Sequence, residues 1–376
     1  MKTVLQVTGT MDRGGAEVML MDLVRKLHRD FRFVFLIHRK KGTQPKGDFD
    51  DELRSLGCEL KYIESVWDIG IKAYKKKFSQ LINEIGKVDI VHSHLNSKGG
   101  IIAKCARACG IPKIIVHSHA KIEFNGSLIY RSVMKAELIL QRRWINRYAT
   151  DYWACSEEAL PSLFTKSHYN SEKAQVIHNA IDPKALTHYD GDTIREELDI
   201  PEDLPVVGSV GRIAKVKNYE LAADLIAALW DKGHKFAYVV AGRKQDDSCS
   251  SYLLEKLGKY EHFYYLGVRG DLGKLYHGMG AYLGTSLREG LGLTAVEAQA
   301  CGVPCLLSQA FPSLCDIGLG LIHRPNEDAL PSWETSLLAL LEQKKTLSTD
   351  EIINALISSG YHIDYEAARV KKLYLE

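Results

Sequence analysis

The chain has 376 residues, of which 45% are hydrophobic and 26% are charged, and its 49 basic and 47 acidic side chains leave a net charge of +2. This length fits about two or three domains of ~150 residues each, and the composition excludes disorder, a collagen-like repeat and a coiled coil. No apolar run approaches the ~20 residues that span a bilayer, and Asp12 and Arg13 follow the first apolar run too soon for a signal peptide. Eight cysteines without Cys-x-x-Cys spacing also fit the cytoplasmic protein that we expect.

The near-zero net charge hides an asymmetry between the two halves. Residues 1–180 carry 29 Lys and Arg against 19 Asp and Glu, a balance of +10, whereas residues 181–376 carry 20 against 28, a balance of −8. Such a split predicts two domains, of which one faces something anionic. Nucleic acid, a membrane and phosphate groups are the candidate partners, and uneven solvation without a partner is the alternative.

The first half alternates short apolar runs with amphipathic stretches. The predicted strands are Thr3–Thr8, Phe31–His38, Glu59–Ile63, Val88–His92, Lys113–His117, Asp151–Ala154 and Gln175–His178. Helical periodicity lies between most of them, for example over Ala16–His28, Tyr74–Ile85 and Ser97–Ala108. Strands that alternate with helices predict right-handed crossovers and a parallel sheet covered on both faces.

The pattern restarts after a polar stretch near Asn179–Pro205. Strands of a second sheet are predicted at Val206–Val210, Phe236–Ala241, Phe263–Leu266, Ala281–Leu283 and Pro304–Leu307. The predicted fold class is therefore α/β, with two tandem Rossmann-like domains, parallel sheets and an interdomain cleft. We place the first domain at 1–182, the second at 183–360, and at 361–376 a C-terminal helix that we expect to pack back on the first domain.

Ligands of such sheets bind outside the carboxyl ends of the strands, so the loops that follow the strands are the candidate sites. In the first of these loops, Gly14 and Gly15 let the backbone approach a ligand closely, and the next helix offers free N–H groups. A phosphate or a sugar fits there, and an ordinary strand-to-helix turn is the alternative. Because the loop lacks the Gly-x-Gly-x-x-Gly pattern, a nicotinamide cofactor is disfavoured.

The first loop of the second half is basic. Gly211 and Arg212 follow the strand Val206–Val210, and Lys217 comes five residues after Arg212. A planar guanidinium fork and a point charge together could neutralise a diphosphate. A solvated basic loop is the alternative interpretation.

The segment Arg288–Ala298 leads from the strand Ala281–Leu283 into a helix. Its glycines, Gly290 and Gly292, would expose backbone amides at the helix N-terminus, where phosphate binds readily. Glu289 lies at the mouth of this loop, and Glu297 could accept hydrogen bonds from hydroxyls such as those of a ribose. The alternatives are a capping role for Glu289 and a solvated helix face for Glu297.

In order along the chain, these motifs resemble the retaining glycosyltransferases of family 4, which have the GT-B fold, and most closely the bacterial exopolysaccharide and capsule branch. The resemblance rests on Gly14–Glu17, Val176–Asp182, Gly211 and Arg212 with Lys217, and Glu289 with Glu297. It runs over essentially the whole chain. One departure is that Val176–Asp182 has His178 and Ala180 where the usual Pro-Asn-Gly-Ile-Asp pattern has proline and glycine.

The resemblance implies a role for each of these residues. Arg212 and Lys217 would hold the donor diphosphate and stabilise it as it leaves, and Glu289 would contact the donor sugar. The donor-binding residues are then Gly14, Gly15, Gly290, Leu291, Gly292, Leu293 and Glu297. Val268 and Arg269 follow a strand, and we place them near the nucleotide base.

Two histidine pairs stand at strand ends: His92 with His94, and His117 with His119. Residues i and i+2 of a strand share a face, so the four side chains could bind zinc, but no carboxylate or cysteine completes that pattern. The resemblance instead implies an acceptor pocket, with His94 as a catalytic candidate and His117 and His119 on the acceptor side. Histidines that simply pack above the sheet are the third interpretation.

Two amphipathic stretches of the first half are strongly basic. The first has the apolar stripe Ile129, Val133, Ala136, Leu140 and Trp144, with Arg131, Lys135 and Arg142 on the opposite face. The second has the stripe Tyr74, Phe78, Leu81 and Ile85, with Lys72, Lys75, Lys76 and Lys77 beside it. The stripes either pack on the sheet or dock on anionic lipid, where each basic residue contributes about 1 kcal/mol. Nucleic acid is disfavoured, since no recognition motif is present.

We therefore expect a retaining, metal-independent glycosyltransferase without a cofactor, a hexosyl- or N-acetylhexosaminyltransferase. It would move a sugar from a nucleotide diphosphate sugar, UDP-sugar foremost, to a glycan hydroxyl in exopolysaccharide or capsule synthesis. A lipid-linked acceptor would explain the basic first half and would place the cytoplasmic protein at the inner face of the plasma membrane. The alternatives are a nucleotide-sugar epimerase of the same fold and a non-catalytic subunit that binds a sugar nucleotide or a glycan.

Overall fold

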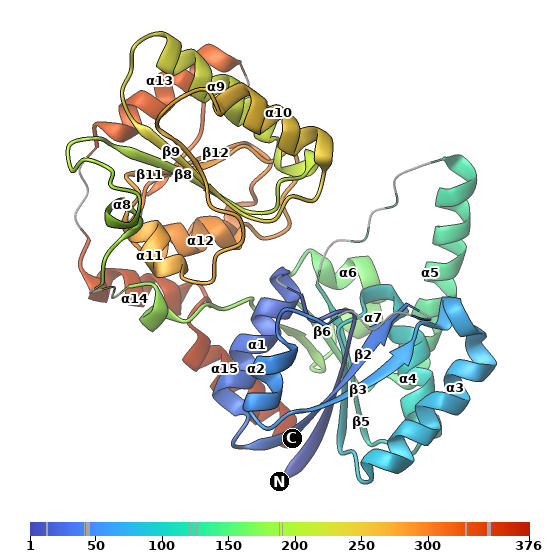
Figure 1. Cartoon of the computed structure of the whole chain (residues 1–376). Helices are drawn as coiled ribbons and strands as arrows, with labels where there is room; N and C mark the ends of the chain where they lie inside the picture. Colours follow the sequence, from blue (N-terminus) through green and yellow to red (C-terminus); the bar gives the residue numbers. More distant parts are fainter. Residues whose placement is uncertain are drawn as a thin grey trace. The chain divides into compact units, whose positions relative to one another are not determined.

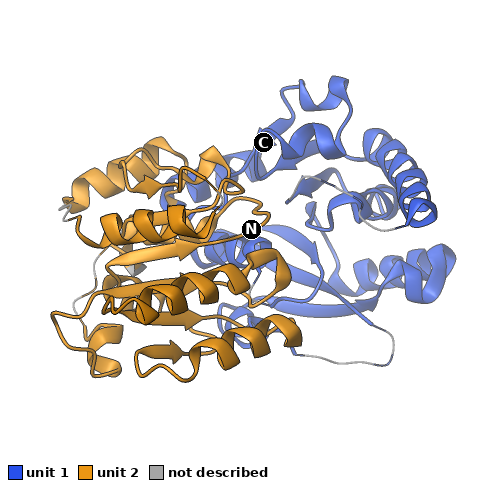
Figure 2. Ribbon diagram, turned by 90° about the horizontal axis from the view of Figure 1, so that it is seen from above, with its two compact units in different colours: residues 1–180, 363–376 blue, residues 181–362 orange. Residues whose placement is uncertain are grey.

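The computed structural model forms two units (Figures 1 and 2). It describes residues 1–12, 14–40, 42, 46–119, 122, 124, 127–187, 189, 191–327, 329–343 and 347–376. The first unit comprises Met1–Ala180 together with Ile363–Glu376, and the second comprises Ile181–His362. The chain therefore passes from one unit to the other twice.

The first unit is built on a parallel sheet of seven strands in the order β3-β2-β1-β4-β5-β6-β7. The strands are β1 (Lys2–Thr8), β2 (Phe31–Arg39), β3 (Glu59–Glu64), β4 (Ile90–Ser93), β5 (Lys113–Ser118), β6 (Asp151–Ala154) and β7 (Ala174–Val176). The helices are α1 (Gly15–Leu27), α2 (Asp50–Ser55), α3 (Val66–Ile85), α4 (Gly99–Ala108), α5 (Leu128–Tyr148), α6 (Ala159–Leu163), α7 (Lys166–Tyr169) and α15 (Ile363–Leu375). The strand order reverses between β1 and β4, which is the switch point where sheets of this kind bind ligands.

The second unit repeats this plan with six parallel strands in the order β10-β9-β8-β11-β12-β13. The strands are β8 (Val206–Val210), β9 (Ala237–Ala241), β10 (Phe263–Tyr265), β11 (Ala281–Gly284), β12 (Cys305–Leu307) and β13 (Ile322–His323). The helices are α8 (Ile194–Glu197), α9 (Tyr219–Asp231), α10 (Asp247–Leu257), α11 (Leu272–His277), α12 (Leu293–Ala300), α13 (Leu330–Leu341) and α14 (Thr349–Ser358). Here the switch point lies between β8 and β11.

The predicted α/β class with two parallel sheets is confirmed, and every predicted strand has a counterpart in the structure. The sequence missed β13, which has only two residues and therefore no recognisable apolar pattern. None of the helices that the structure describes carries an apolar stretch long enough to cross a bilayer.

Each sheet is buried between two apolar clusters because alternate side chains of a strand point to opposite faces. In β1, for example, Leu5 packs in the cluster that α3 and α4 help to form, and Val4 packs in the cluster under α1 and α15. The last helix contributes Ile363, Val370 and Tyr374 to that second cluster. Figure 1 shows α15 beside α1, so the C-terminal helix forms part of the core of the first unit.

A ladder of histidines interrupts this apolar core near the switch point of the first unit. The side chains of His92, His94 and His117 are buried, and His119 is half-buried. Burial lowers the pKa of the first three well below the ordinary value and lowers that of His119 to about 4. All four are therefore uncharged at neutral pH.

Acidification should destabilise the first unit more than the second. In the unfolded chain the four histidines take up protons below about pH 6.5, whereas in the fold they resist protonation, so each costs about 1.4 kcal/mol of stability per pH unit. The loss begins near pH 6.5 and continues towards pH 4, where His119 takes up its proton in the fold as well. Above pH 6.5 both states hold neutral histidine, and this contribution stays constant.

Hydrogen–deuterium exchange between pH 7.5 and 5, corrected for intrinsic rates, measures this effect. Strands β8 and β9 are the internal control, because the described residues of the second unit include no buried histidine. We expect β4 and β5 to lose protection relative to β8 and β9 as the pH falls. Parallel behaviour of the two sheets would contradict the assignment of the ladder as neutral.

Candidate functional site

Two loops of the second unit are fastened together at its switch point. One follows β8 and the other follows β11. The backbone N–H of Leu287 donates to the carbonyl of Val216 at 2.8 Å, and the hydroxyl of Thr285 donates to the carbonyls of Lys217 at 3.0 Å and Asn218 at 2.9 Å. These bonds fix the positions of both loops relative to the sheet without any ligand.

An ion pair between the side chains of Lys217 and Glu289 also joins the two loops. We call the place where these loops meet the junction. The Lys217 Nζ lies 2.5 Å from the Glu289 Oε2, and both side chains are mostly buried. The Ser286 hydroxyl donates to the same oxygen at 3.2 Å, and the Gly290 N–H donates to Oε1 at 3.2 Å. Glu289 does not cap α12, whose N-cap residue is Gly292. The structure thus brings a fixed cation and a fixed carboxylate together at the carboxyl edge of the sheet.

Arg212 lies on the same edge and is exposed. Its Nη1 donates to the Gln245 Oε1 at 2.9 Å. The backbone around it is set by two glycines, since a Cβ on Gly242 would lie 1.8 Å from the Gly211 carbonyl oxygen. This close approach joins the loops after β8 and β9, and the Arg212 side chain next to it is open to solvent.

The start of α12 exposes backbone rather than side chains. Gly292 has φ +75°, and a Cβ there would lie 2.8 Å from the Phe311 ring, so glycine is required for both reasons. A Cβ on Gly290 would meet nothing within 4 Å, and the backbone there borders open space. The side chain of Leu291 belongs to the core of the unit, and that of Leu293 packs against it.

Glu297 is buried, so its interpretation as part of a solvated helix face is wrong. It lies in the second turn of α12, and its Oε2 accepts a hydrogen bond from the Tyr276 hydroxyl at 3.0 Å. Burial and the neighbouring carboxylate both raise the pKa of Tyr276, so this phenol stays a donor. The hydrogen bond from Tyr276 therefore fixes the orientation of the Glu297 carboxylate.

The structure does not bring Arg269 and Val268 to this junction. They follow β10, the outermost strand on its side of the sheet. The Arg269 guanidinium makes a two-point contact with Glu197 at 2.7 and 3.0 Å and also binds Asp271 at 2.8 and 2.5 Å. Together with Lys274 it lowers the pKa of Glu197 to about 2. Arg269 is thus held in an ion network, whereas Val268 is exposed.

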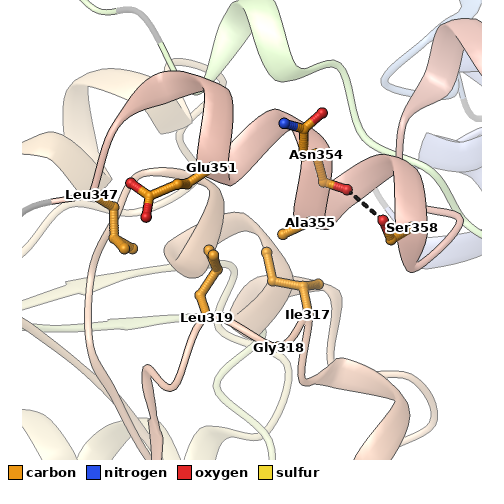
Figure 3. A pocket seen from close by; sticks show the side chains of 8 residues that line it. All are labelled: Ile317, Gly318, Leu319, Leu347, Glu351, Asn354, Ala355 and Ser358. Atoms are coloured by element: carbon orange, nitrogen blue, oxygen red, sulfur yellow. Dashed lines mark hydrogen bonds between the residues drawn. The ribbon is translucent and has the colours of Figure 1, made fainter.

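A cavity of about 550 Å³ lies elsewhere in the second unit, between α14 and the loop that precedes β13 (Figure 3). Its lining residues are Ile317, Gly318, Leu319, Leu347, Glu351, Asn354, Ala355 and Ser358. None of the catalytic or binding residues that the sequence predicts lines this cavity. Its carboxylate, Glu351, already accepts hydrogen bonds from Ser348 at the start of α14.

In the first unit, the loop after β1 and the segment before the crossing to the second unit lie side by side. Gly14 is the N-cap residue of α1, and the Asn179 amide donates to the carbonyl of Gly15 at 3.4 Å. The His178 N–H donates to the Glu366 carboxylate of α15 at 2.8 Å. A contact from the last helix thus holds the segment in which the usual proline and glycine are absent.

The four histidines lie at the switch point beside this loop. Gln6 of β1 fixes the protonation pattern of the outer pair, His94 and His119. The His94 Nε2 lies 2.8 Å from the Gln6 carbonyl oxygen, which can only accept, so His94 carries its proton there. Its Nδ1 is then the acceptor for the His119 Nε2 at 2.8 Å. Both histidines are therefore held in one tautomer.

The inner pair, His92 and His117, is held by Tyr374 of the last helix. The Gln6 amide donates to the Tyr374 hydroxyl at 3.1 Å, which in turn donates to the His92 Nδ1 at 2.7 Å. The His92 Nε2 then donates to the His117 Nδ1 at 3.1 Å. Neither Gln6 nor Tyr374 was among the residues predicted from the sequence. A polar residue inside an apolar strand was a signal for Gln6, but no local signal exists for Tyr374.

The geometry of the four histidines also bears on whether they bind zinc. Nitrogens of His92, His94 and His117 lie within 4.8 Å of one another, close enough for a metal site. However, the rings of His92 and His117 are 5° from parallel, and the His92 Nε2 and the His117 Nδ1 are joined by a hydrogen bond. A metal would have to displace the proton of this bond, so the geometry fits a hydrogen-bonded network better than a metal site.

The chain is similar to known proteins over most of its length. Residues 190–318 match the family model described as "Glycosyl transferases group 1", and residues 13–185 match the one described as "Glycosyltransferase Family 4". The chain is 32% identical over 334 residues to "Putative glycosyltransferase EpsF" of Bacillus subtilis (strain 168), with 86% of this chain and 83% of that protein covered.

A second relative is the UDP-Gal:alpha-D-GlcNAc-diphosphoundecaprenol alpha-1,3-galactosyltransferase of Escherichia coli, which is 25% identical over 306 residues, or 77% of this chain and 76% of that protein. Among solved structures, HepE of Anabaena in complex with UDP and glucose superimposes with a TM-score of 0.76 over 99% of both chains, at 19% identity. That likeness shows the fold. Sequence match and fold agree that the chain belongs to the family 4 glycosyltransferases, enzymes of the GT-B fold.

Proposed function

We propose that this glycosyltransferase moves a sugar from a UDP-sugar to a hydroxyl of a lipid-linked glycan during exopolysaccharide or capsule synthesis, with retention of anomeric configuration. The observation that carries the proposal is the junction of Lys217 and Glu289 at the switch point of the second sheet. The name of the Escherichia coli relative supports the donor and acceptor classes, since it gives UDP-galactose and a diphosphoundecaprenol-linked sugar.

The donor binds at the switch point of the second unit in this proposal. Lys217 and Arg212 contact the diphosphate, and the amides of Gly290–Leu293 complete its surroundings. Because Lys217 and its loop are fixed in advance, their positive charge stabilises the departing diphosphate without reorganisation. Glu297, directed by Tyr276, accepts hydrogen bonds from the ribose hydroxyls.

The transfer then proceeds on one face of the donor sugar. The bond between the anomeric carbon and the diphosphate oxygen breaks, and its electron pair stays on the diphosphate. The acceptor oxygen bonds to the anomeric carbon from the same side, and its proton passes to the departing phosphate oxygen. This route uses no protein nucleophile, metal or cofactor. Glu289 is held by Lys217 and Ser286 and contacts the sugar hydroxyls.

The acceptor binds at the switch point of the first unit in this proposal. His94 and His119 are neutral there and each is restricted to one tautomer. Neutral imidazoles exchange hydrogen bonds with hydroxyls and do not attract phosphate by charge. This chemistry favours a sugar hydroxyl at the His119 Nδ1, which has no hydrogen-bond partner among the residues that the structure describes, with His94 and His117 behind it and Gly14 and Gly15 at the same edge.

The diphosphate role is tested by Lys217→Ala. We expect kcat to fall at least about 100-fold, because one preorganised electrostatic contact to the leaving group is lost. The matched control is Lys215→Ala, since Lys215 is an exposed lysine of the same short helical turn, Lys215–Lys217. The readout is nucleotide release with and without a lipid extract, using the nucleotide sugar that gives the largest thermal shift in a screen.

Four outcomes of that assay are informative. Release that depends on the extract and is lost only in Lys217→Ala supports the transferase. Conversion of the nucleotide sugar to an epimer without the extract would favour the epimerase, and donor binding without turnover would favour the non-catalytic subunit. Equal turnover in the two variants would remove the role of Lys217.

The ribose contact is tested by Glu297→Gln. We expect KM for the donor to rise about tenfold or more with a smaller change in kcat, because a charged acceptor is replaced by a neutral amide in a contact made before and during transfer. The thermal midpoint of the variant controls for the buried position of Glu297. Unchanged donor KM in a variant of normal stability would show that Glu297 does not contact the nucleotide.

A further inference from the structure

The apolar stripe of α5 is not the face that this helix buries. The fully buried side chains of α5 are Gln141 and Ile145, whereas Ile129 is 80% exposed, Val133 is 59% exposed and Leu140 is 42% exposed. Trp144, at the C-terminal end of the stripe, packs against the core, but the part of the stripe from Ile129 to Leu140 points to solvent. Contiguous exposed apolar surface of this kind usually marks an interaction site.

The basic helix α3 provides an internal comparison. It has the same combination of lysines and apolar spacing, and it buries Tyr74, Phe78, Ile82 and Ile85 in the core. Its stripe thus packs on the sheet, as amphipathic helices do. The exposure of the α5 stripe is accordingly a property of α5 and not of basic amphipathic helices in this fold.

The exposed surface lies in the first half of α5. Leu128 is also largely exposed, as are Tyr130 and Ile139, and Figure 1 shows this half extending away from the other elements of the first unit. The helix contacts the turn Asn96–Lys98, and the Asn96 side chain accepts a hydrogen bond from the His119 N–H at 2.6 Å. The helix that carries the exposed surface therefore packs beside the edge at which we place the acceptor.

The charges of α5 indicate what covers this surface. The helix carries five basic residues and one acidic residue, and Arg131, Lys135 and Arg142 lie opposite the stripe. Basic residues on the polar face and large apolar residues on the other are typical of helices that lie in a membrane surface. A second copy of this chain would bring two such cationic helices together, which electrostatic repulsion opposes.

We propose that the segment Leu128–Leu140 inserts the stripe of Ile129, Val133 and Leu140 into the surface of an anionic lipid bilayer. Arg131 and Lys135 then lie among the headgroups. The inference rests on the proposed function in one respect: a lipid-linked acceptor lies in that surface, and α5 brings it next to the edge that carries His94 and His119.

The test is co-sedimentation of the full chain with vesicles of phosphatidylcholine, with and without phosphatidylglycerol. We expect binding to the anionic vesicles, weakened by salt, and a loss of at least about 100-fold in the double variant Ile129→Glu with Val133→Glu, because two apolar contacts become charges. The matched control is Leu375→Glu on α15, where the replaced leucine is 55% exposed but lies outside the stripe.

A separate readout distinguishes this inference from the proposed function. Thermal shift with UDP should be identical in the wild type, the double variant and the control, since no residue of α5 contacts the donor. Vesicle binding without transferase activity would contradict only the proposed function. Equal vesicle binding by the double variant, no binding by the wild type, or a dimer in light scattering that the double variant dissociates would overturn the membrane assignment.

Discussion

The ion pair between Lys217 and Glu289 is the contact on which the second switch point depends. It joins the loop after β8 to the loop after β11, which the hydroxyl of Thr285 and the backbone of Leu287 also hold together. A partly buried ion pair is costly unless further hydrogen bonds satisfy it. Ser286 and Gly290 supply such bonds to the carboxylate, which in turn holds the lysine in place.

The two switch points differ in charge, although the sheets share one plan. At the second, Lys217 and Arg212 present cationic groups next to backbone amides, which suits a diphosphate. At the first, burial keeps four histidines neutral and hydrogen-bonded in series, which suits hydroxyl groups. The same fold thus offers two chemically distinct edges, and this division suits the proposed transfer from a charged nucleotide donor to a neutral hydroxyl of the acceptor.

Most of the fold follows from local sequence, but the partners of several side chains do not. Buried parallel strands can be recognised in the sequence as apolar runs. Among the strands of the described residues, only β13, with two residues, was too short to be recognised. Periodicity showed that α5 is amphipathic, yet it could not show that the helix buries Gln141 and Ile145 in place of its apolar stripe. Which face packs depends on the neighbours that the rest of the fold supplies.

The same distinction holds for the site. Glycine and charge spacing drew attention to Lys217 and Glu289 separately, because each lies in a loop after a central strand of one sheet, but the ion pair between them was not predicted. The burial of Glu297 depends on Tyr276, and the tautomers of the histidines depend on Tyr374, which lies 282 residues from His92 along the chain. Arg269 was assigned to the base, but nothing in the sequence indicated its ion network with Glu197.

The central claim is that the second switch point grips a diphosphate. A crystal structure of the chain with UDP tests it most directly. The account predicts diphosphate oxygens within hydrogen-bond distance of the Lys217 ammonium and the Arg212 guanidinium, with the ribose at Glu297. A well-ordered UDP bound at any other place, such as the cavity beside α14, would contradict it.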